Sequence, residues 1–179
     1  MLRLTAVAAA VMIPSGTGCI GSTDEHRFTS ADLERILAED DLAPEGTTFD
    51  ATISGDFGPA DVDYYSDKRA RRLEKFNFTS GRSVSFMPDS ESGEVPSAEG
   101  YLFGDSSDAE GYFSAERLRR RWSARDSLDA CGLGDEGFGW RSVSSSQGYF
   151  WRMNNLVIFA SGDRAFVDAL DARARQASE

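Results

Sequence analysis

The chain has 179 residues, with 19 lysines and arginines against 30 aspartates and glutamates, which gives a formal net charge of −11. A protein that binds nucleic acid needs a basic surface or stripe to hold phosphates, so this balance argues against nucleic acid as a partner. The length suits one domain of about 150 residues, which is enough to bury a core of its own.

The amino terminus has the pattern of a bacterial signal peptide. Arg3 supplies a positive charge, and ten apolar residues follow it from Leu4 to Ile13. Ten apolar residues are too few to span a bilayer, but they suit the apolar region of a signal peptide. We therefore expect three parts: residues 1–18 as signal peptide, 19–28 as a polar tether and 29–179 as one extracytoplasmic domain.

The residues around Cys19, SGTGC, resemble the lipobox of bacterial lipoproteins, in which the cysteine is lipidated and becomes the first mature residue. Thr17 and Gly18 fit this pattern, whereas Gly16 stands where a leucine-like residue is usual. The resemblance implies a protein held at the cell membrane by acyl groups on Cys19. The alternative is ordinary secretion, in which Cys19 is free or forms a disulfide with Cys131. If Cys19 is lipidated, Cys131 has no partner, and its apolar surroundings favour a buried thiol over a reactive one.

In the first half of the domain, helices are predicted to alternate with short strands. Leu33, Ile36 and Leu37 form one apolar stripe, and Thr29 or Ser30 can cap the helix that carries them. Prolines, a glycine and acids make Asp89–Ala98 an expected exposed loop. The predicted elements are a helix over Thr29–Asp40, a strand over Thr48–Ser54, a helix over Asp61–Phe78 and a strand over Ser83–Met87.

Two further helices are predicted in the second half. The first follows a strand at Tyr101–Phe103 and runs from Ser107, its expected cap, to Trp122. Tyr112, Ala115 and Trp122 fall near one face of it. The second runs over Arg164–Arg175, with Asp163 as its cap and a stripe formed by Phe166, Ala169 and Leu170.

A β-hairpin is the strongest local signal in the chain. Tyr149–Met153 and Leu156–Ala160 are two apolar five-residue runs joined by Asn154-Asn155, a pair that suits a type I′ turn. Strand alternation then gives two apolar faces, which predicts an interior place in a sheet for the second strand. Phe138–Ser144 is the expected preceding strand, so the order of elements predicts an α+β fold with an antiparallel meander near its end. One face would carry Trp151, Met153, Leu156 and Ile158, and the other Phe150, Val157 and Phe159.

Two segments of the meander resemble a family pattern. Leu133–Phe138 (LGDEGF) and Phe150–Ile158 (FWRMNNLVI) are similar to exported lipoproteins and sensor-like extracytoplasmic domains of actinobacteria, which carry an LGDEAF turn and an FRRGNVVV hairpin. Gly137 stands where that family usually has alanine, and Asn154 where glycine is common. The resemblance implies a small extracytoplasmic α+β domain and brings no catalytic residues.

The sequence offers no recognisable catalytic or metal-binding set. His26, the one histidine, falls in the predicted tether, where it cannot pack against a serine or cysteine nucleophile. Asp105, Ser107 and Glu116 are spaced as in a calcium-binding loop, but Glu110 stands where that loop requires glycine. We therefore predict no catalytic residues, no metal site and no cofactor.

Two basic runs and one acidic turn are candidate contact residues. The basic runs are either solvated helix faces paired with local acids or a surface for anionic headgroups and wall polymers. Asp135 and Glu136 either form the turn before a strand or contact a partner together with Arg152. The candidate anion contacts are Arg69, Arg72, Arg117, Arg119, Arg120 and Arg121.

These features together predict a membrane-anchored lipoprotein with a non-catalytic, sensor-like domain. Its partners would be the membrane, through the lipid anchor, and an envelope ligand or protein. Two alternatives stay open: a secreted hydrolase that uses carboxylates, and a structural envelope protein without a small ligand. A deep pocket with two facing carboxylates would favour the hydrolase.

Overall fold

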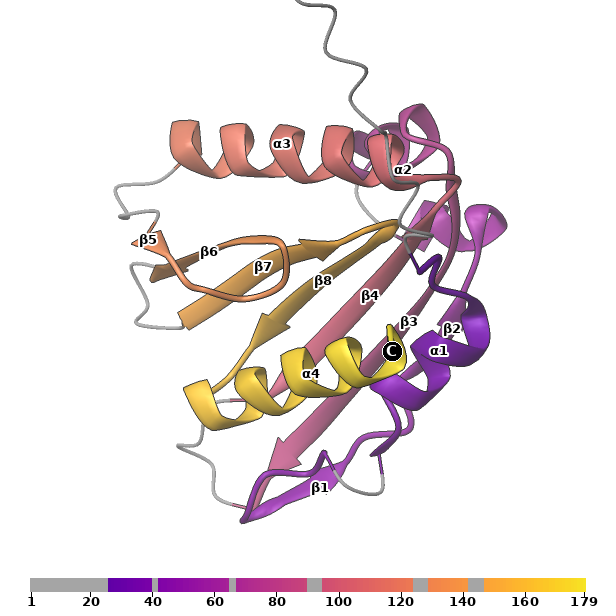
Figure 1. The fold of residues 1–179 in the computed structure, drawn as a ribbon. Helices are drawn as coiled ribbons and strands as arrows, with labels where there is room; N and C mark the ends of the chain where they lie inside the picture. The colour runs from indigo at the N-terminus through magenta and orange to yellow at the C-terminus, as the bar shows by residue number, and fades with distance from the viewer. Residues whose placement is uncertain (1–25, 40–41, 65–66, 90–94, 124–128, 142–146) are drawn as a thin grey trace, which may run out of the picture.

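A computed structural model of the chain describes residues 26–39, 42–64, 67–89, 95–123, 129–141 and 147–179 (Figure 1). The predicted signal peptide, Cys19 and the tether up to residue 25 lie outside these residues. The helices are α1 (Ser30–Ile36), α2 (Asp67–Lys75), α3 (Ser106–Ser123) and α4 (Arg164–Ala177), with a 3₁₀ helix η2 at Pro59–Tyr64. In the described part of the chain, none of the helices combines the length and the apolar character needed to cross a bilayer.

All strand pairings that are described are antiparallel, which confirms the predicted α+β class. The sheet has the order β1-β3-β4-β8-β7-β6-β5, and β2 pairs with β3 outside this path. The strands are β1 (Thr47–Phe49), β2 (Gly55–Phe57), β3 (Phe78–Pro88), β4 (Ser97–Phe103), β5 (Asp129–Ala130), β6 (Glu136–Arg141), β7 (Gln147–Met153) and β8 (Leu156–Ser161).

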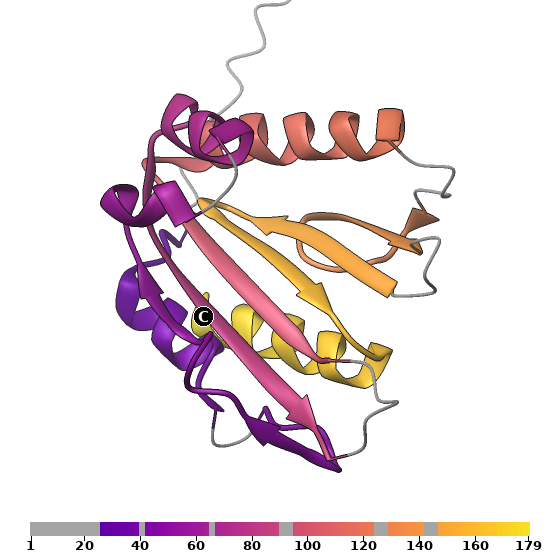
Figure 2. The same ribbon diagram turned by 180° about the vertical axis from the view of Figure 1, so that it is seen from behind.

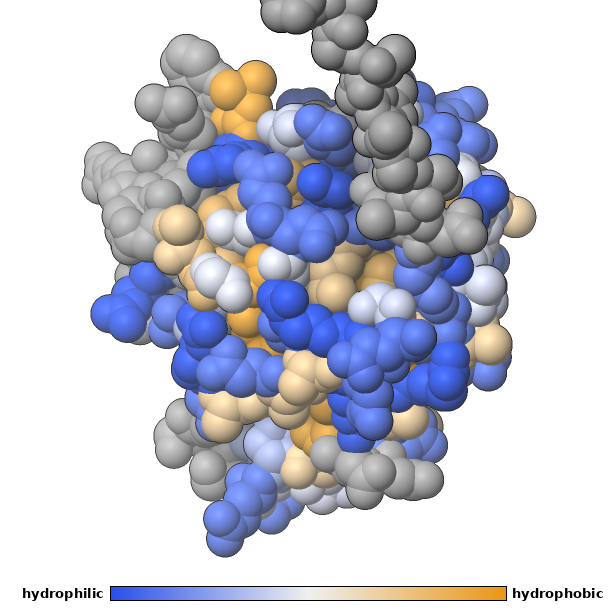
Figure 3. Space-filling model, in the orientation of Figure 1, coloured by the Kyte–Doolittle hydropathy of each residue, from blue (hydrophilic) through white to orange (hydrophobic). Residues whose placement is uncertain are grey.

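Helices cover both faces of this sheet, so the domain has two cores. On the face turned to the viewer in Figure 1, Ile36 of α1 and Leu170 of α4 pack in the same core as Ile158 of β8. On the opposite face, seen in Figure 2, Phe113 of α3 packs in the same core as Phe150 of β7. Polar side chains cover most of the outer surface over α1 and α4 (Figure 3), as the acidic composition leads one to expect.

The hairpin register and its two faces are confirmed, because Trp151 and Ile158 lie in one core while Phe150 and Val157 lie in the other. Strand β8 lies between β4 and β7, which is the predicted interior position. The turn type was predicted wrongly: Asn154 has φ 49°, but Asn155 does not take the positive φ that a type I′ turn also needs. The cross-strand pairs are Met153 with Leu156, Arg152 with Val157, Trp151 with Ile158 and Phe150 with Phe159.

Predicted and observed helix ends differ at α3. The caps of α1 and α4 are Thr29 and Asp163, as expected. Ser107 does not cap α3, because it lies inside the helix. Instead, the Asp105 carboxylate accepts a hydrogen bond from the backbone N–H of Asp108 at 2.9 Å. In α4, Val167 is buried in place of the predicted Ala169, which is exposed.

The strand predicted in the first half over Thr48–Ser54 is shorter in the structure. The strand over Thr48–Ser54 stops at Phe49, because the Asp50 carboxylate accepts hydrogen bonds from Thr52 and turns the chain. Ile53, predicted to alternate inward, is 56% exposed.

The helix over Asp61–Phe78 is divided into η2 and α2. It ends before Asn77, whose φ of 51° is the left-handed conformation found after helix ends, so that Phe78 already begins β3. The strands predicted at Ser83–Met87 and Tyr101–Phe103 exist, but they are the parts of β3 and β4 that are richest in apolar residues.

We expect Asp163→Ala to lower the free energy of unfolding by about 1 kcal/mol, because it removes the bond that the Asp163 carboxylate accepts from Phe166 N–H. Asp168→Ala is the matched control in the same helix, since Asp168 only pairs with Arg164 on the exposed surface. Such a pair contributes at most about 0.5 kcal/mol. Urea unfolding curves measure both effects, and equal losses for the two variants would contradict the capping role.

Candidate functional site

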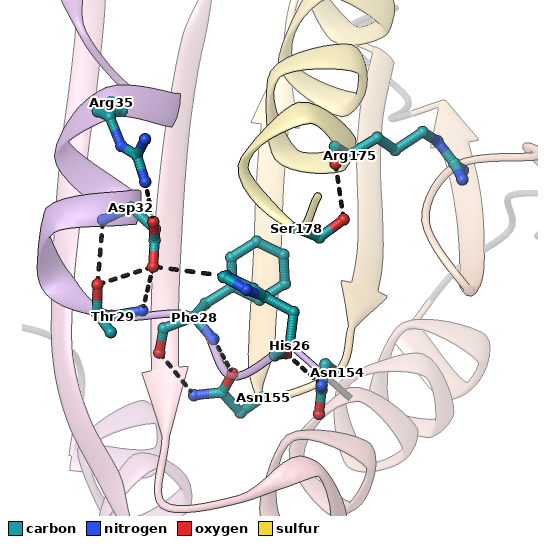
Figure 4. Close-up of polar contacts among 9 residues, drawn as sticks. All are labelled: His26, Phe28, Thr29, Asp32, Arg35, Asn154, Asn155, Arg175 and Ser178. Carbon is teal, nitrogen blue, oxygen red and sulfur yellow. Dashed lines mark hydrogen bonds and ion pairs between the residues drawn. The ribbon is translucent and has the colours of Figure 1, made fainter. Parts of the chain in front are cut away.

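The first described residues are fixed to the turn between β7 and β8. Phe28 is 3% exposed, and its backbone N–H donates to the Asn155 side-chain oxygen at 2.8 Å. The Asn155 amide donates back to the Phe28 carbonyl at 3.1 Å, and the Asn154 amide donates to the His26 carbonyl (Figure 4). Residues 26–28, which we call the strap, therefore belong to the folded domain, although the sequence placed them in the tether.

Asp32 of α1 holds the strap from the other side. The His26 Nε2 atom lies 3.6 Å from the Asp32 carboxylate, and the ring meets Phe28 edge to face at 4.9 Å (Figure 4). Burial raises the pKa of Asp32, but hydrogen bonds from Thr29 and the charge of Arg35 outweigh burial, so the pKa lies below its usual value. Asp32 is thus a stable anion that faces the strap.

The contribution of Asp32 to stability should depend on pH in a defined direction. Because the pKa of Asp32 is lower in the folded chain, its stabilisation is present above about pH 4 and is lost as the pH falls through the lowered pKa. We expect Asp32→Asn to destabilise the domain at pH 7 and the difference from wild type to shrink at pH 3. Urea unfolding at both pH values measures it, and a difference that stays constant would overturn the assignment.

A pocket of about 540 Å³ opens where the strap meets the hairpin turn. We call it the strap pocket. Its walls come from the strap, the start of α3, the turn before β6, the end of β7 and the end of α4. The lining residues are His26, Phe28, Ser106, Glu110, Asp135, Arg152, Met153, Asn154 and Ser178.

Two of the three predicted partner-contact residues line this pocket together. The Arg152 guanidinium lies 4.0 Å from the Asp135 carboxylate, which also accepts a hydrogen bond from Asn154 N–H at 3.0 Å. Glu136 is the register partner of Arg152, but its carboxylate pairs with Arg117 of α3 at 2.5 Å. The hairpin register therefore brings Asp135 and Arg152 together and directs Glu136 elsewhere.

Helix α4 fixes the loop that presents Asp135. Asp171 accepts a hydrogen bond from Gly134 N–H at 2.8 Å, and Arg175 donates to the Gly134 carbonyl at 3.0 Å. Gly134 has φ 57°, and a Cβ there would lie 2.4 Å from the Arg152 carbonyl oxygen, so only glycine fits. The position of Asp135 is thus set by a backbone conformation and two side-chain contacts.

The strap pocket offers groups of both charges to a ligand. Arg152 is 17% exposed, and its buried Nε atom has no hydrogen-bond partner among the residues that the structure describes. It can donate to a carboxylate or phosphate, while Glu110 and Asp135 can accept from an amine. Among the described residues, no three histidine, cysteine or acidic side chains converge to hold a metal ion.

The two predicted basic runs meet across the other face of the sheet. Glu116 of α3 is 4% exposed, and its carboxylate binds Arg72 of α2 at 2.6 Å and Arg119 at 2.8 Å. Arg69 of α2 pairs with Glu99 of β4. Of the six candidate anion contacts, the side chain of Arg121 lies outside what the structure describes. Arg119 pairs with an acid of its own helix, as the interpretation of locally paired acids expects. Arg69, Arg72 and Arg117 instead meet acids of other elements, which the sequence did not indicate.

Sequence reasoning also missed four side chains beside these arginines. Glu99 and Tyr101 lie on β4, and the Tyr101 hydroxyl donates to the Glu99 carboxylate. Trp140 and Phe159 lie on β6 and β8 and stack at 5.6 Å. The predicted strands placed Phe159 on the correct face, but nothing local in the sequence joins it to Trp140 or to an arginine.

Cys131 is half-buried, packs against the core under α4 and forms no disulfide within the described part of the chain. Burial raises the pKa of this thiol above its usual value, which lowers the thiolate fraction. These observations fit the predicted burial role.

Comparison with known proteins identifies no family for this chain. No protein-family model matches the chain, and no curated protein matches it. Among solved structures, the extracellular domain of PknH from Mycobacterium tuberculosis is similar, with a TM-score of 0.44 and 10% identity over 84% of this chain and 91% of that chain. At this distance the likeness says nothing about what the chain binds.

Proposed function

We propose that this chain is an exported, lipid-tethered protein whose domain binds a ligand or partner at the outer side of the cell membrane and catalyses no reaction. The export pattern of residues 1–18 and the lipobox at Cys19 support the location. The observation that carries the binding role is the strap pocket, because it holds opposite charges at the point where the tether joins the domain.

The arrangement couples anchor and site. His26 and Phe28 line the pocket and also lead back to Cys19, so only a short segment separates the acylated residue from the pocket. A ligand held there would lie near the envelope layer that surrounds the anchor. Arg152 would bind its anionic group, and Asp135 and Glu110 its cationic group.

Intact mass and detergent-phase partition in a bacterial host test the anchor. We expect the wild type to gain a diacylglycerol-sized mass and to enter the detergent phase, and Cys19→Ala to do neither. Cys131→Ser is the matched control and should remain lipidated. A wild type of unmodified mass that stays in the aqueous phase would refute the anchor.

Co-sedimentation with isolated cell envelopes tests the pocket separately from the anchor. The Cys19→Ala chain should sediment with envelopes, and adding Arg152→Gln should weaken this several-fold. Arg141→Gln, at the exposed end of β6 and outside the strap pocket, should not. Equal sedimentation of all three chains would exclude the strap pocket as the binding site.

A carboxylate-dependent hydrolase is the second candidate, and Glu99 favours it. Burial raises the pKa of Glu99, although Arg69 and Arg120 act against this, and a raised pKa suits a general acid. Glu99 also lines a pocket of about 440 Å³ with Asp56 and Asp61. Those two carboxylates are already bound, to Arg82 at 2.8 Å and to Gly58 N–H at 2.7 Å. Turnover of chromogenic glycosides that Glu99→Gln abolishes would establish the hydrolase instead.

A further inference from the structure

A cluster of arginine, aromatic and acidic side chains occupies the sheet face that α2 and α3 partly cover. Figure 2 shows both helices along one end of this face, with β4 and β8 running on beyond them. The cluster is separate from the strap pocket, and no residue lines both. We call it the arginine–aromatic site, and it consists of Arg69, Glu99, Tyr101, Arg120, Trp140 and Phe159.

The fold brings these residues together from five elements. Glu99 and Phe159 are register partners on β4 and β8, so they lie side by side on the sheet. Trp140 reaches them from β6 because Gly148 on the intervening β7 has no side chain. A Cβ at Gly148 would lie 2.3 Å from the Trp140 ring. Arg69 of α2 and Arg120 of α3 approach this floor from above.

Each arginine lies over an aromatic ring. The Arg120 guanidinium carbon is 3.6 Å from the centre of the Trp140 ring and 5.5 Å from that of Phe159. The Arg69 guanidinium carbon is 5.3 Å from the centre of the Tyr101 ring. Stacking occupies the flat face of a guanidinium and leaves the N–H groups at its edge for hydrogen bonds. Both arginines are therefore held in fixed orientations.

The surroundings of the site disfavour the charged forms of Arg120 and Glu99. Burial, together with the positive charges of Arg119 and Arg69, lowers the pKa of Arg120 to about 10, against the opposing effect of Glu116. Burial raises the pKa of Glu99, even though Arg69 and Arg120 are close enough to lower it. A second anion would stabilise both guanidiniums and would relieve Glu99 of that role.

The site can be reached from solvent. The side chains of Arg69 and Glu99 are 27% and 24% exposed, and Arg120, Trp140 and Phe159 are half-buried. A carboxylate has two oxygens and suits one guanidinium, whereas a tetrahedral oxyanion can accept hydrogen bonds from two. Two arginines from two different helices, α2 and α3, thus favour a phosphate-type group.

We propose that the arginine–aromatic site binds a phosphate-type oxyanion, with Arg69 and Arg120 as donors and Glu99 as the internal anion that the ligand displaces. The group can be a free phosphate or the phosphate of a lipid headgroup. This site does not depend on the lipid anchor or on the strap pocket, so phosphate binding can be tested separately from both.

Tryptophan fluorescence of the full chain carrying Cys19→Ala tests the proposal, because the ligand would move Arg120 on Trp140. Inorganic phosphate, titrated at constant ionic strength against chloride, should give a saturable change that Trp140→Phe removes. Arg120→Ala should weaken binding about tenfold, as expected for the loss of a charged hydrogen bond. Glu99→Gln should tighten binding several-fold, because it removes the competing anion and keeps the shape.

Two control variants distinguish a loss of phosphate binding from a folding defect. Arg120→Lys keeps the charge but not the planar stacking, so it should bind more weakly than wild type with unchanged circular dichroism. Arg35→Ala should bind like wild type.

Phosphatidylglycerol vesicles distinguish the two ligand sources. Saturation by inorganic phosphate without vesicle binding would identify a free phosphate, whereas Arg120-dependent vesicle binding alone would identify a headgroup. Absence of a saturable signal with both probes, in wild type and in Glu99→Gln, would overturn the proposal. So would an Arg120→Ala variant that is folded and binds as tightly as wild type.

Discussion

Trp151→Ala is expected to lower the free energy of unfolding by about 4 kcal/mol, the largest effect of any single substitution considered for this chain. Trp151 is 0% exposed and lies in the core beneath α1 and α4. Two glycines make room for it, because a Cβ at Gly134 or Gly137 would come within 2.8 Å or 3.0 Å of its atoms. Alanine would leave a cavity that these rigid neighbours cannot fill.

Trp151→Phe separates ring volume from the indole N–H. The buried Trp151 Nε1 atom has no hydrogen-bond partner in the part of the chain that the structure describes, so its removal relieves a cost and offsets part of the lost volume. We expect Phe to cost about 1 kcal/mol. Urea unfolding followed by circular dichroism measures both variants. A loss below about 1 kcal/mol for Trp151→Ala would show that the core can collapse around the site.

Asn155→Ala is expected to cost about 3 kcal/mol, because it deletes one buried side chain that makes three hydrogen bonds. Asn155 is 2% exposed, and it bonds the N–H and carbonyl of Phe28 and the carbonyl of Phe103. Alanine would leave these buried backbone groups unpaired. The strap should then detach, so trypsin should cleave after Arg27 faster than in the wild type.

Asn154→Gly is the matched control for Asn155→Ala. Glycine accepts the positive φ of position 154. The substitution removes only the hydrogen bond that the Asn154 side-chain amide donates to the His26 carbonyl. We expect it to cost less than about 1 kcal/mol and to leave the strap docked. If both variants released the strap equally, the contact of Asn154 with the His26 carbonyl would be as important for holding it as the hydrogen bonds of Asn155.

The parts of the fold that sequence predicted are those where local pattern and burial agree. Trp151 and Val157 lie on strands whose side chains alternate between two buried faces. This periodicity predicted both the register of the strands and the core in which each residue lies. Strand β3 failed this test, because its Ser80–Ser83 segment is polar or small. It is a strand because β2 and β4 pair with its backbone on either side. The properties of its own residues do not indicate this pairing.

The candidate sites divide in the same way. Asp135 and Arg152 could be named together because Asp135 lies just before a predicted strand and Arg152 lies within the predicted hairpin. Glu99 was missed because it lay at the edge of an expected loop, and its partner Arg69 is 30 residues away. Phe28 was assigned to the tether because its neighbours are polar, and only Asn155, distant in sequence, explains its burial.

The strap has a consequence for the order in which the chain can fold. Phe28 can be fixed only after Asn155, 127 residues later, has been synthesised. In the same way, one edge of β4 stays unpaired until β8 forms. Such long-range closures slow folding, and an uncovered strand edge during synthesis invites pairing with other chains. A ribosome that stalls before the final hairpin would release a fragment with an open edge and an uncovered Phe28. Nonsense mutations even late in the gene should therefore yield aggregated or degraded product, with no partly functional domain.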